Sequence, residues 1–259
     1  MVGVSPRQAK APPLTAPAID EAVAWHDVEC AGYAADLALW RELAAGAAGA
    51  LLEIGAGTGR VALNLAERGQ EVSALDSEPA LAAELGARAR RRGLRVHVHC
   101  GDARTFALER RFVLIVAPMQ VVQLLGGVAG RRSMLAAARR HLDIGGLLTI
   151  ALADPLEGLD AGAVLPPLPD VRELGGWIYS SRPVALRHEH GAIAIDRIRE
   201  SVSPTGELRA SAVTLHLDVV DADGLAKLAS ETGFRELDRR RVPATDAYVG
   251  SEILVLEAE

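Results

Sequence analysis

Short apolar runs alternate with helical segments between residues 50 and 152, and this alternation restricts the possible folds more than any other feature of the chain. The runs are rich in Val, Ile and Leu, as expected for strands that are buried on both faces of a sheet. Strands that alternate with helices are typical of βαβ units with right-handed crossovers. The pattern predicts an α/β fold with a doubly wound, mostly parallel, seven-stranded sheet. The predicted strands are residues 50–54, 71–75, 95–99, 112–117, 147–152, 234–242 and 253–257.

The periodicity changes after Asp154. Residues 155–175 are rich in Pro and Gly and are predicted to form a loop. Three β-like runs follow, separated by turn-forming residues, at 177–187, 192–202 and 208–220. In the last run Val213, Leu215 and Leu217 alternate with polar residues, which is typical of a half-buried antiparallel strand. We therefore expect an antiparallel three-stranded meander inserted into the α/β domain.

These patterns divide the chain into an arm, a core and an insertion. Residues 1–18 contain much Ala and Pro and no apolar run of signal-peptide length, so we expect a flexible arm. Residues 19–153 and 221–259 are expected to form the core, with two N-terminal cover helices before the first strand. The insertion at 154–220 is expected to form a lid over a ligand or a dimer contact.

Composition and charge narrow the possible partners and the location. The formal net charge of −6 argues against a nucleic-acid partner. No run of 18 apolar residues occurs, so we expect no membrane partner. Cys30 and Cys100 belong to no Cys/His cluster, so neither a disulfide framework nor a metal site is expected. These features together favour a cytoplasmic protein.

A glycine-rich sequence follows the first predicted strand. Gly55, Gly57 and Gly59 stand at alternate positions just before a predicted helix. Glycine lets a ligand approach the main chain, and open α/β sheets bind ligands at the carboxyl ends of central strands. In the dinucleotide fingerprint Gly-x-Gly-x-x-Gly the third glycine would fall where this chain has Arg60, which weakens a pyrophosphate interpretation without excluding it. A tight turn without a ligand is the simpler alternative.

Carboxylates follow the next two predicted strands. Asp76 lies about 20 residues beyond the glycines, where a carboxylate accepts hydrogen bonds from a ribose diol. It is also placed to cap the helix that begins near Pro79. Asp102 follows the third predicted strand, where an acid can accept a hydrogen bond from an adenine amino group. An ordinary loop carboxylate is the alternative there.

In their order along the chain, these features resemble the nucleoside-binding motifs of class I, Rossmann-like S-adenosylmethionine-dependent methyltransferases of the small-molecule type. The motifs are Glu53-x-Gly55-x-Gly57-x-Gly59, Asp76, Gly101-Asp102-Ala103, the strand and loop at 113–118 and the turn at 141–148. Tyr33-x-x-Asp36-Leu37-x-x-Trp40 also looks like the family's cofactor-covering helix. The residues Ala117-Pro118-Met119-Gln120 depart from the Asn/Asp-Pro-Pro-aromatic box of adenine N-methyltransferases, which argues against a nucleic-acid base as substrate.

The resemblance implies S-adenosyl-L-methionine as the cofactor and gives roles on its methionine side. Gly55 and Gly57 would lie against the methionine part. Glu53 would help set the glycine loop and face the amino group through water. Ala117 would border the methyl-donor side, and Tyr33 would close over it.

On the nucleoside side the resemblance implies four contacts. Asp76 would hold the ribose, and Ser77 would flank the adenine. Asp102 and Ala103 would meet the adenine edge. These positions lie at the ends of neighbouring strands, so the resemblance implies a nucleoside that lies across the edge of the sheet.

The activity implied is methyl transfer to an oxygen or nitrogen atom of a small molecule, such as a sugar or another natural product, by an enzyme that is a candidate homodimer. No catalytic residue is assigned, because a base is needed only for a hydroxyl or a protonated amine. His26 is one of several candidate bases, and Gln120 and Gln123 are candidates for the acceptor pocket. An NAD(P)-dependent oxidoreductase and a non-catalytic cofactor-binding protein are the alternatives.

Overall fold

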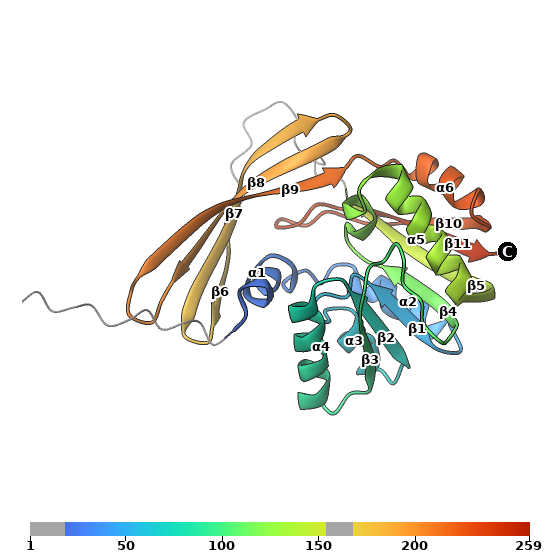
Figure 1. Ribbon diagram of the computed structural model, residues 1–259, viewed down its shortest axis with the longest axis horizontal. Helices are drawn as coiled ribbons and strands as arrows, with labels where there is room; N and C mark the ends of the chain where they lie inside the picture. The colour runs from blue at the N-terminus through green and yellow to red at the C-terminus, as the bar shows by residue number, and fades with distance from the viewer. Residues whose placement is uncertain (1–18, 154–167) are drawn as a thin grey trace, which may run out of the picture.

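The computed structural model describes residues 19–153 and 168–259, which form a seven-stranded sheet and a separate four-stranded sheet. Figure 1 shows the four-stranded sheet extending from the α/β core, with α1 (Glu21–Cys30) beside it. The arm expected at residues 1–18 lies outside the described residues, as does the 155–167 part of the expected loop. None of the helices in the described parts of the chain has both the length and the apolarity needed to cross a membrane.

The large sheet has the predicted doubly wound, mostly parallel arrangement. Its strands are β1 (Leu51–Ile54), β2 (Val72–Asp76), β3 (Val96–Cys100), β4 (Phe112–Ala117), β5 (Leu142–Ala153), β10 (Phe234–Val242) and β11 (Ser251–Ala258). They run in the order β10-β11-β5-β4-β1-β2-β3, and β11 pairs antiparallel with both of its neighbours. The strand order reverses between β1 and β4, and a reversal of this kind opens a ligand-binding crevice at the carboxyl ends of the strands.

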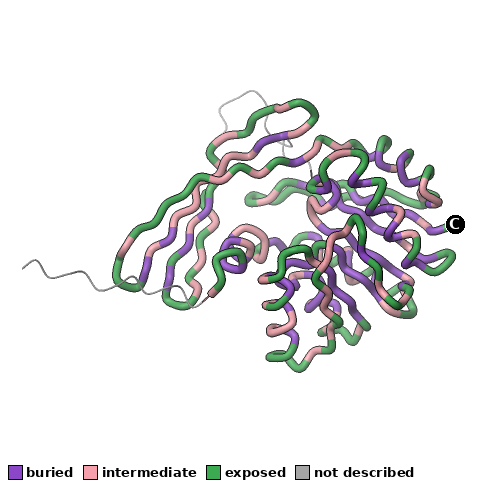
Figure 2. Tube along the Cα trace, viewed as in Figure 1, coloured by how far each residue is buried: buried purple, intermediate pink, exposed green. Residues whose placement is uncertain are grey.

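Helices cover both faces of this sheet, whose strands form the buried centre in Figure 2. The remaining helices are α2 (Leu37–Ala45), α3 (Ala62–Ala66), α4 (Pro79–Arg91), α5 (Gly127–His141), α6 (Ala222–Ser230) and the 3-10 helix η1 (Val121–Leu124). On one face, buried residues of α2, α3 and α4 pack together around Trp40. On the other, α5 and α6 pack around Met134 and Leu225. The two apolar clusters hold the sheet between two helical layers.

The small sheet has one strand more than the sequence predicts. It contains β6 (Asp170–Leu174), β7 (Trp177–Glu189), β8 (Ala192–Val202) and β9 (Leu208–Asp218), all antiparallel in that order. The prediction of a loop as far as residue 175 was therefore wrong for β6. This strand is short and contains three charged residues, so its sequence lacks an apolar signal. Its ladder with β7, from Asp170↔Ser181 to Leu174↔Trp177, forms the strand.

The helix α1 joins the small sheet to the core. Trp25 packs edge-on against Tyr179 of β7, with ring centroids 5.1 Å apart, in a cluster that also contains Trp177. At the same time α1 contacts α4 of the core. Because α1 touches both parts, it fixes the position of the small sheet over the carboxyl ends of the large sheet's strands.

Candidate functional site

The turn after β1 needs glycine for two reasons. Gly55 and Gly57 have φ angles of 70° and 54°, in the left-handed region that favours glycine. A Cβ atom at Gly55 would lie 2.4 Å from the Val121 side chain, and one at Gly57 would lie 2.1 Å from Nε2 of His26. Side chains from η1 and α1 therefore pack directly on the bare backbone of this glycine loop.

Asp76 connects the end of β2 to the glycine loop. Its Oδ2 accepts a hydrogen bond from the backbone N–H of Gly57 at 2.7 Å, and its Oδ1 accepts one from the N–H of Glu78 at 2.9 Å. The N-cap of α4 is Glu78, which accepts from the N–H of Ala80, so the capping role considered for Asp76 falls to another residue. The Asp76 carboxylate keeps further acceptor capacity for a ligand.

Glu53 is a buried carboxyl group with an unused oxygen. The residue is 3% exposed, and among the described residues Oε2 has no hydrogen-bond partner. Burial raises the pKa of Glu53 to about 8, against the opposing effect of Arg60. A buried acceptor without a partner costs free energy that a donor from a ligand would recover. The ammonium group of S-adenosyl-L-methionine is such a donor, so the residues present fit the amino-acid end of that cofactor.

Arg60 ties the N-terminal cover segment to the glycine loop. Its guanidinium donates to both carboxylate oxygens of Asp36, at 2.5 and 2.7 Å, and to the carbonyl of Tyr33 at 3.1 Å. It also lies over the Tyr33 ring, 5.0 Å from the centroid, and Tyr33 packs against Tyr248. Tyr33 is thus buried beside the loop. Arg60, which stands where the dinucleotide fingerprint has its third glycine, therefore has a structural role.

A second set of contacts holds α1 on the same loop. Thr58 Oγ1 donates to Asp27 Oδ1 at 2.7 Å, and Arg88 of α4 forms an ion pair with Asp27. Burial alone would raise the pKa of Asp27, but hydrogen bonds from His26, Arg88 and Thr58 lower it well below its usual range. The sequence places His26 on an N-terminal helix near the presumed cofactor site, but its contact with Gly57 could not be predicted, because no spacing rule relates a residue of α1 to the loop.

The predicted nucleoside contacts lie together at the ends of β2 and β3. Asp76 pairs with Cys100, and Gly101 N–H donates to the Asp76 carbonyl at 2.9 Å, which brings Ser77 and Asp102 to the same edge of the sheet. Arg104 binds the Asp102 carboxylate through its guanidinium and lowers the pKa of that group. Ala103 packs against the core. The contact of Asp102 with adenine stays a prediction.

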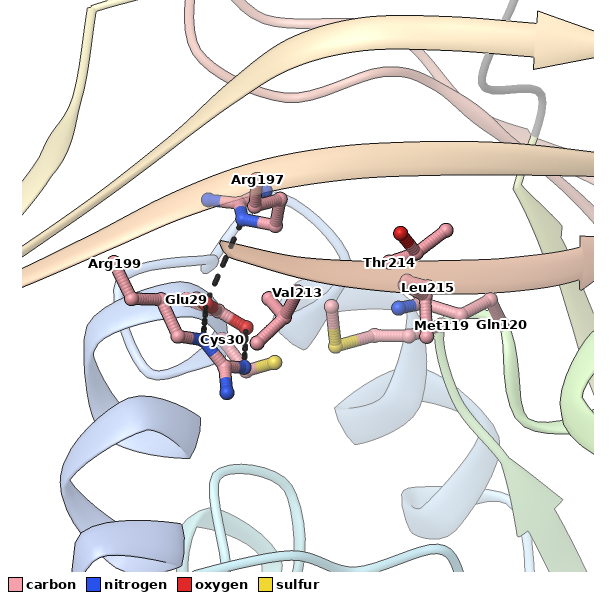
Figure 3. Close-up of a pocket in the computed structure, with 9 residues that line it drawn as sticks. All are labelled: Glu29, Cys30, Met119, Gln120, Arg197, Arg199, Val213, Thr214 and Leu215. Atoms are coloured by element: carbon pink, nitrogen blue, oxygen red, sulfur yellow. Dashed lines mark hydrogen bonds and ion pairs between the residues drawn. The ribbon is translucent and has the colours of Figure 1, made fainter. Parts of the chain in front are cut away.

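A cavity of about 250 Å³ lies beyond the end of β4, between α1 and the small sheet (Figure 3). Ala117 is fully buried at the end of β4. Two residues later, Met119 has a φ of 58°, which is unusual for a residue with a side chain. The residues that line the cavity are Glu29, Cys30, Met119, Gln120, Arg197, Arg199, Val213, Thr214 and Leu215. The cavity is therefore formed jointly by the cover helix, the loop after β4 and the strands β8 and β9.

The polar groups of this cavity are largely paired with one another. Glu29 accepts two hydrogen bonds from Arg199, both at 2.8 Å, and one from Ser181 at 2.7 Å. These bonds and the charge of Arg197 outweigh burial and lower the pKa of Glu29. Burial raises the pKa of the neighbouring Cys30 thiol to about 11. Both residues are therefore held in a single protonation state at neutral pH.

The two glutamines suggested for the acceptor pocket have different positions. Gln120 lines the cavity, and its contact with an acceptor stays a prediction. Gln123 is buried, accepts from the N–H of Ala153 at 2.9 Å and donates to the carbonyl of the same residue at 3.0 Å. The suggestion for Gln123 was therefore wrong, because its amide satisfies the backbone at the end of β5.

Comparisons with known proteins agree with this geometry. Residues 51–146 match the family model of a methyltransferase domain. A search of curated proteins finds no match. Among solved structures, an S-adenosylmethionine-dependent methyltransferase from Clostridium acetobutylicum superposes with a TM-score of 0.70 at 13% identity, covering 91% of this chain and 96% of that one.

Two further solved structures come from enzymes whose names state their substrates. The sugar N-methyltransferase KedS8 from a Streptoalloteichus species has a TM-score of 0.67 at 20% identity, and each chain is covered completely. The amino pentose methyltransferase CalS10 from Micromonospora echinaspora has a TM-score of 0.64 at 23% identity, covering 91% of this chain and 92% of that one. At these identities the superpositions show that the chains share one fold.

Proposed function

We propose that this protein is a class I (Rossmann-like) S-adenosylmethionine-dependent methyltransferase that transfers a methyl group to an oxygen or nitrogen atom of a small molecule, and the matched domain and the shared fold support this. One observation carries the proposal. The loop after β4 packs on the glycine loop through Val121 and also lines the 250 Å³ cavity through Met119 and Gln120. A donor on the glycine loop and an acceptor in the cavity would therefore meet at this loop.

The cofactor S-adenosyl-L-methionine, when bound, supplies a methyl group that its positive sulfur activates for direct displacement. The residues of this chain bind and orient it. Glu53 would accept from the ammonium group, Asp76 would accept from the ribose hydroxyls, and the Gly55–Gly57 backbone would lie against the methionine part, next to His26. Alignment of this kind is worth ~7–11 kcal/mol of the barrier, so the binding residues carry most of the protein's contribution.

The remaining cofactor contacts form part of the same proposal. Ser77, Asp102 and Ala103 would surround the adenine at the ends of β2 and β3. Ala117 would border the methyl group, and Tyr33 would close the site from the cover segment. The packing of Tyr33 beneath Arg60 supports its position at the edge of the loop.

The acceptor that we propose is an amine of a sugar or of another natural product. The names of the superposed sugar N-methyltransferase and amino pentose methyltransferase support this class. Glu29 is held ionised by Arg199, and the Cys30 thiol has a raised pKa, so neither group is suited to take a proton from a hydroxyl at neutral pH. A neutral amine needs no such base. The preference for nitrogen over oxygen therefore applies to an amine that arrives unprotonated, and its main support is the names of these two enzymes.

The insertion at 154–220 would roof the acceptor and also join two subunits. Residues of β8 and β9 line the cavity, which supports the lid. Ile178 and Leu208, 49% and 62% exposed, lie on the opposite face of the same sheet, which supports a dimer contact. We propose a cytoplasmic homodimer that acts on small molecules without a nucleic-acid or membrane partner, and light scattering of the purified protein tests the subunit number.

The activity is tested with S-adenosyl-L-methionine that carries a deuterated methyl group and a panel of amino sugars, sugars and small natural-product amines and alcohols. Mass spectrometry is expected to find the labelled methyl group on amine members of the panel, and Asp76→Ala should lose most of the product. Labelled product on hydroxyl members alone would contradict the preference for nitrogen. Binding of the cofactor without transfer to any member would favour a non-catalytic role.

A further inference from the structure

A second cavity, of about 120 Å³, lies farther along the small sheet, between β7–β9 and the start of α1. One water molecule needs only ~10–15 Å³ of such space, so the cavity has room for a group of several atoms. Three aromatic residues, two serines, two arginines and one carboxylate line it, namely Trp25, Trp177, Tyr179, Ser201, Ser211, Arg199, Arg209 and Glu21, together with Ala210. No step of the proposed methyl transfer uses this cavity.

Tyr179 gives this cavity a buried donor without a partner. The residue is 3% exposed, and its hydroxyl has no hydrogen-bond partner among the described residues. Burial raises the pKa of Tyr179, so the hydroxyl stays protonated. Its edge-to-face contact with Trp25 fixes the ring. The molecule thus maintains an unsatisfied donor that an acceptor group on a ligand would satisfy.

Two arginines add further donors. Arg209 lies over the Trp177 ring, 5.0 Å from its centroid, and within the described part of the chain it forms no ion pair with a carboxylate. Arg199 lies over Trp25 and uses Nε and Nη2 on Glu29, which leaves Nη1 for another acceptor. The carboxylate of Glu21 accepts from the Trp25 indole at 3.1 Å. Donors therefore outnumber acceptors around the cavity.

We propose that this second cavity is an oxyanion subsite, which holds a phosphate or carboxylate group of the methyl acceptor while the reacting amine lies in the cavity beside Met119. The proposal rests on the proposed function for its biological use. Arg199 lines both cavities, and Val213 of the first lies four residues along β9 from Arg209 of the second, or roughly 13 Å. An acceptor with an amine and an oxyanion separated by about that distance would fill both.

The tryptophans provide the test. Trp25 and Trp177 line the subsite, so their fluorescence is expected to change when the protein, without cofactor, is titrated with inorganic phosphate or with acetate at constant ionic strength. Saturable binding of either anion is expected, and the stronger of the two identifies the oxyanion that the subsite prefers. Arg209→Gln should weaken it at least ~10-fold, since it removes a charged donor.

The matched control is Arg182→Gln, which removes a charge from the same sheet on its outer face and should leave anion binding unchanged. No saturable binding of either anion, or equal weakening in the two variants, would overturn the proposal.

Tyr179→Phe separates a binding role from a packing role. It removes an unsatisfied hydroxyl, so the melting temperature should stay level or rise while anion binding weakens several-fold. A fall in stability with unchanged anion binding would overturn the role of Tyr179.

S-adenosylhomocysteine is titrated in parallel. Its affinity should be the same in the wild type and in Arg209→Gln, because Arg209 lines the second cavity and not the first. If the wild type binds S-adenosylhomocysteine but neither anion, the oxyanion subsite is wrong and the proposed function stands. If the wild type does not bind S-adenosylhomocysteine, that result counts against the proposed function and not against the subsite.

Discussion

The carboxylate of Asp76 accepts a hydrogen bond from the backbone N–H of Gly57 across 2.7 Å, so the end of β2 holds the loop that follows β1. The other oxygen of Asp76 accepts from the N–H of Glu78 at 2.9 Å. Both bonds fix the direction of the carboxylate before any ligand binds. A ribose diol held by Asp76 would therefore lie against a loop of defined shape, and binding would require little reorganisation.

Removal of this carboxylate should weaken cofactor binding. Asp76→Ala deletes the ribose acceptor and the bond to Gly57, and a charged hydrogen bond is worth ~1–3 kcal/mol. Calorimetry with S-adenosylhomocysteine should show a loss of affinity of roughly 5- to 150-fold. The control variant is Asp223→Ala, because the side chain of Asp223 on α6 is 85% exposed. Unchanged affinity in Asp76→Ala would show that another residue holds the ribose.

Two glycine substitutions separate backbone strain from steric contact. Gly57→Ala and Gly69→Ala both place a side chain on a residue with positive φ, at 54° and 82°. At Gly57 the new Cβ would lie 2.1 Å from His26, whereas at Gly69 nothing lies within 4 Å. Both should lose ~1–2 kcal/mol of stability from strain. Gly57→Ala should lose more and should also lose S-adenosylhomocysteine binding, whereas equal effects of the two substitutions would contradict the role of the His26 contact.

The pKa of Glu53 predicts a pH dependence of stability. Burial raises the pKa from 4.5 to about 8, so the folded protein holds this proton more tightly than the unfolded chain does. The contribution of protonated Glu53 to the free energy of unfolding is fully present below pH 4.5 and is lost as the pH rises through about 8. In urea denaturation at several pH values, Glu53→Gln should flatten the decline in the free energy of unfolding between pH 5 and pH 8. A parallel decline in both proteins would assign the pH dependence to other groups.

The Arg60–Asp36 pair should behave as a unit. Asp36 is buried, the Arg60 side chain is 9% exposed, and Asp36 also accepts from the Trp40 indole at 2.7 Å. Arg60→Met leaves an unpaired buried carboxylate and should cost about 3–5 kcal/mol of stability. Adding Asp36→Asn should restore part of that loss, because the amide is neutral and can still accept from Trp40. Equal losses in the single and double variants would mean that the pair has no coupling in the folded protein.

The sequence predicted those features that depend on local pattern. The parallel strands follow from apolar runs such as the one at Phe112–Ala117, and the glycine loop follows from residues that tolerate positive φ. The position of Asp76 at the sheet edge follows from the alternation alone, because the carboxyl ends of parallel strands meet there. These features need no knowledge of distant contacts.

Features that depend on contacts between distant segments could not be predicted from the sequence. The charged strand β6 forms only because β7 provides a ladder for it. Glu29 and Arg199 are 170 residues apart, and nothing in the spacing of either indicates that they form one wall of a cavity. His26 and Gly57 likewise meet only because Asp27 and Arg88 hold α1 on the core. The glycine loop was therefore predictable from the sequence, whereas for the cavity beside it the sequence indicated only Gln120 and the inserted sheet.

Calorimetric titration of the purified wild-type protein with S-adenosylhomocysteine and, separately, with NADH tests the central claim most directly. The account predicts that S-adenosylhomocysteine binds at one site per chain and that NADH produces no binding heat. Binding of NADH without binding of S-adenosylhomocysteine would contradict it and would identify the glycine loop as a dinucleotide site.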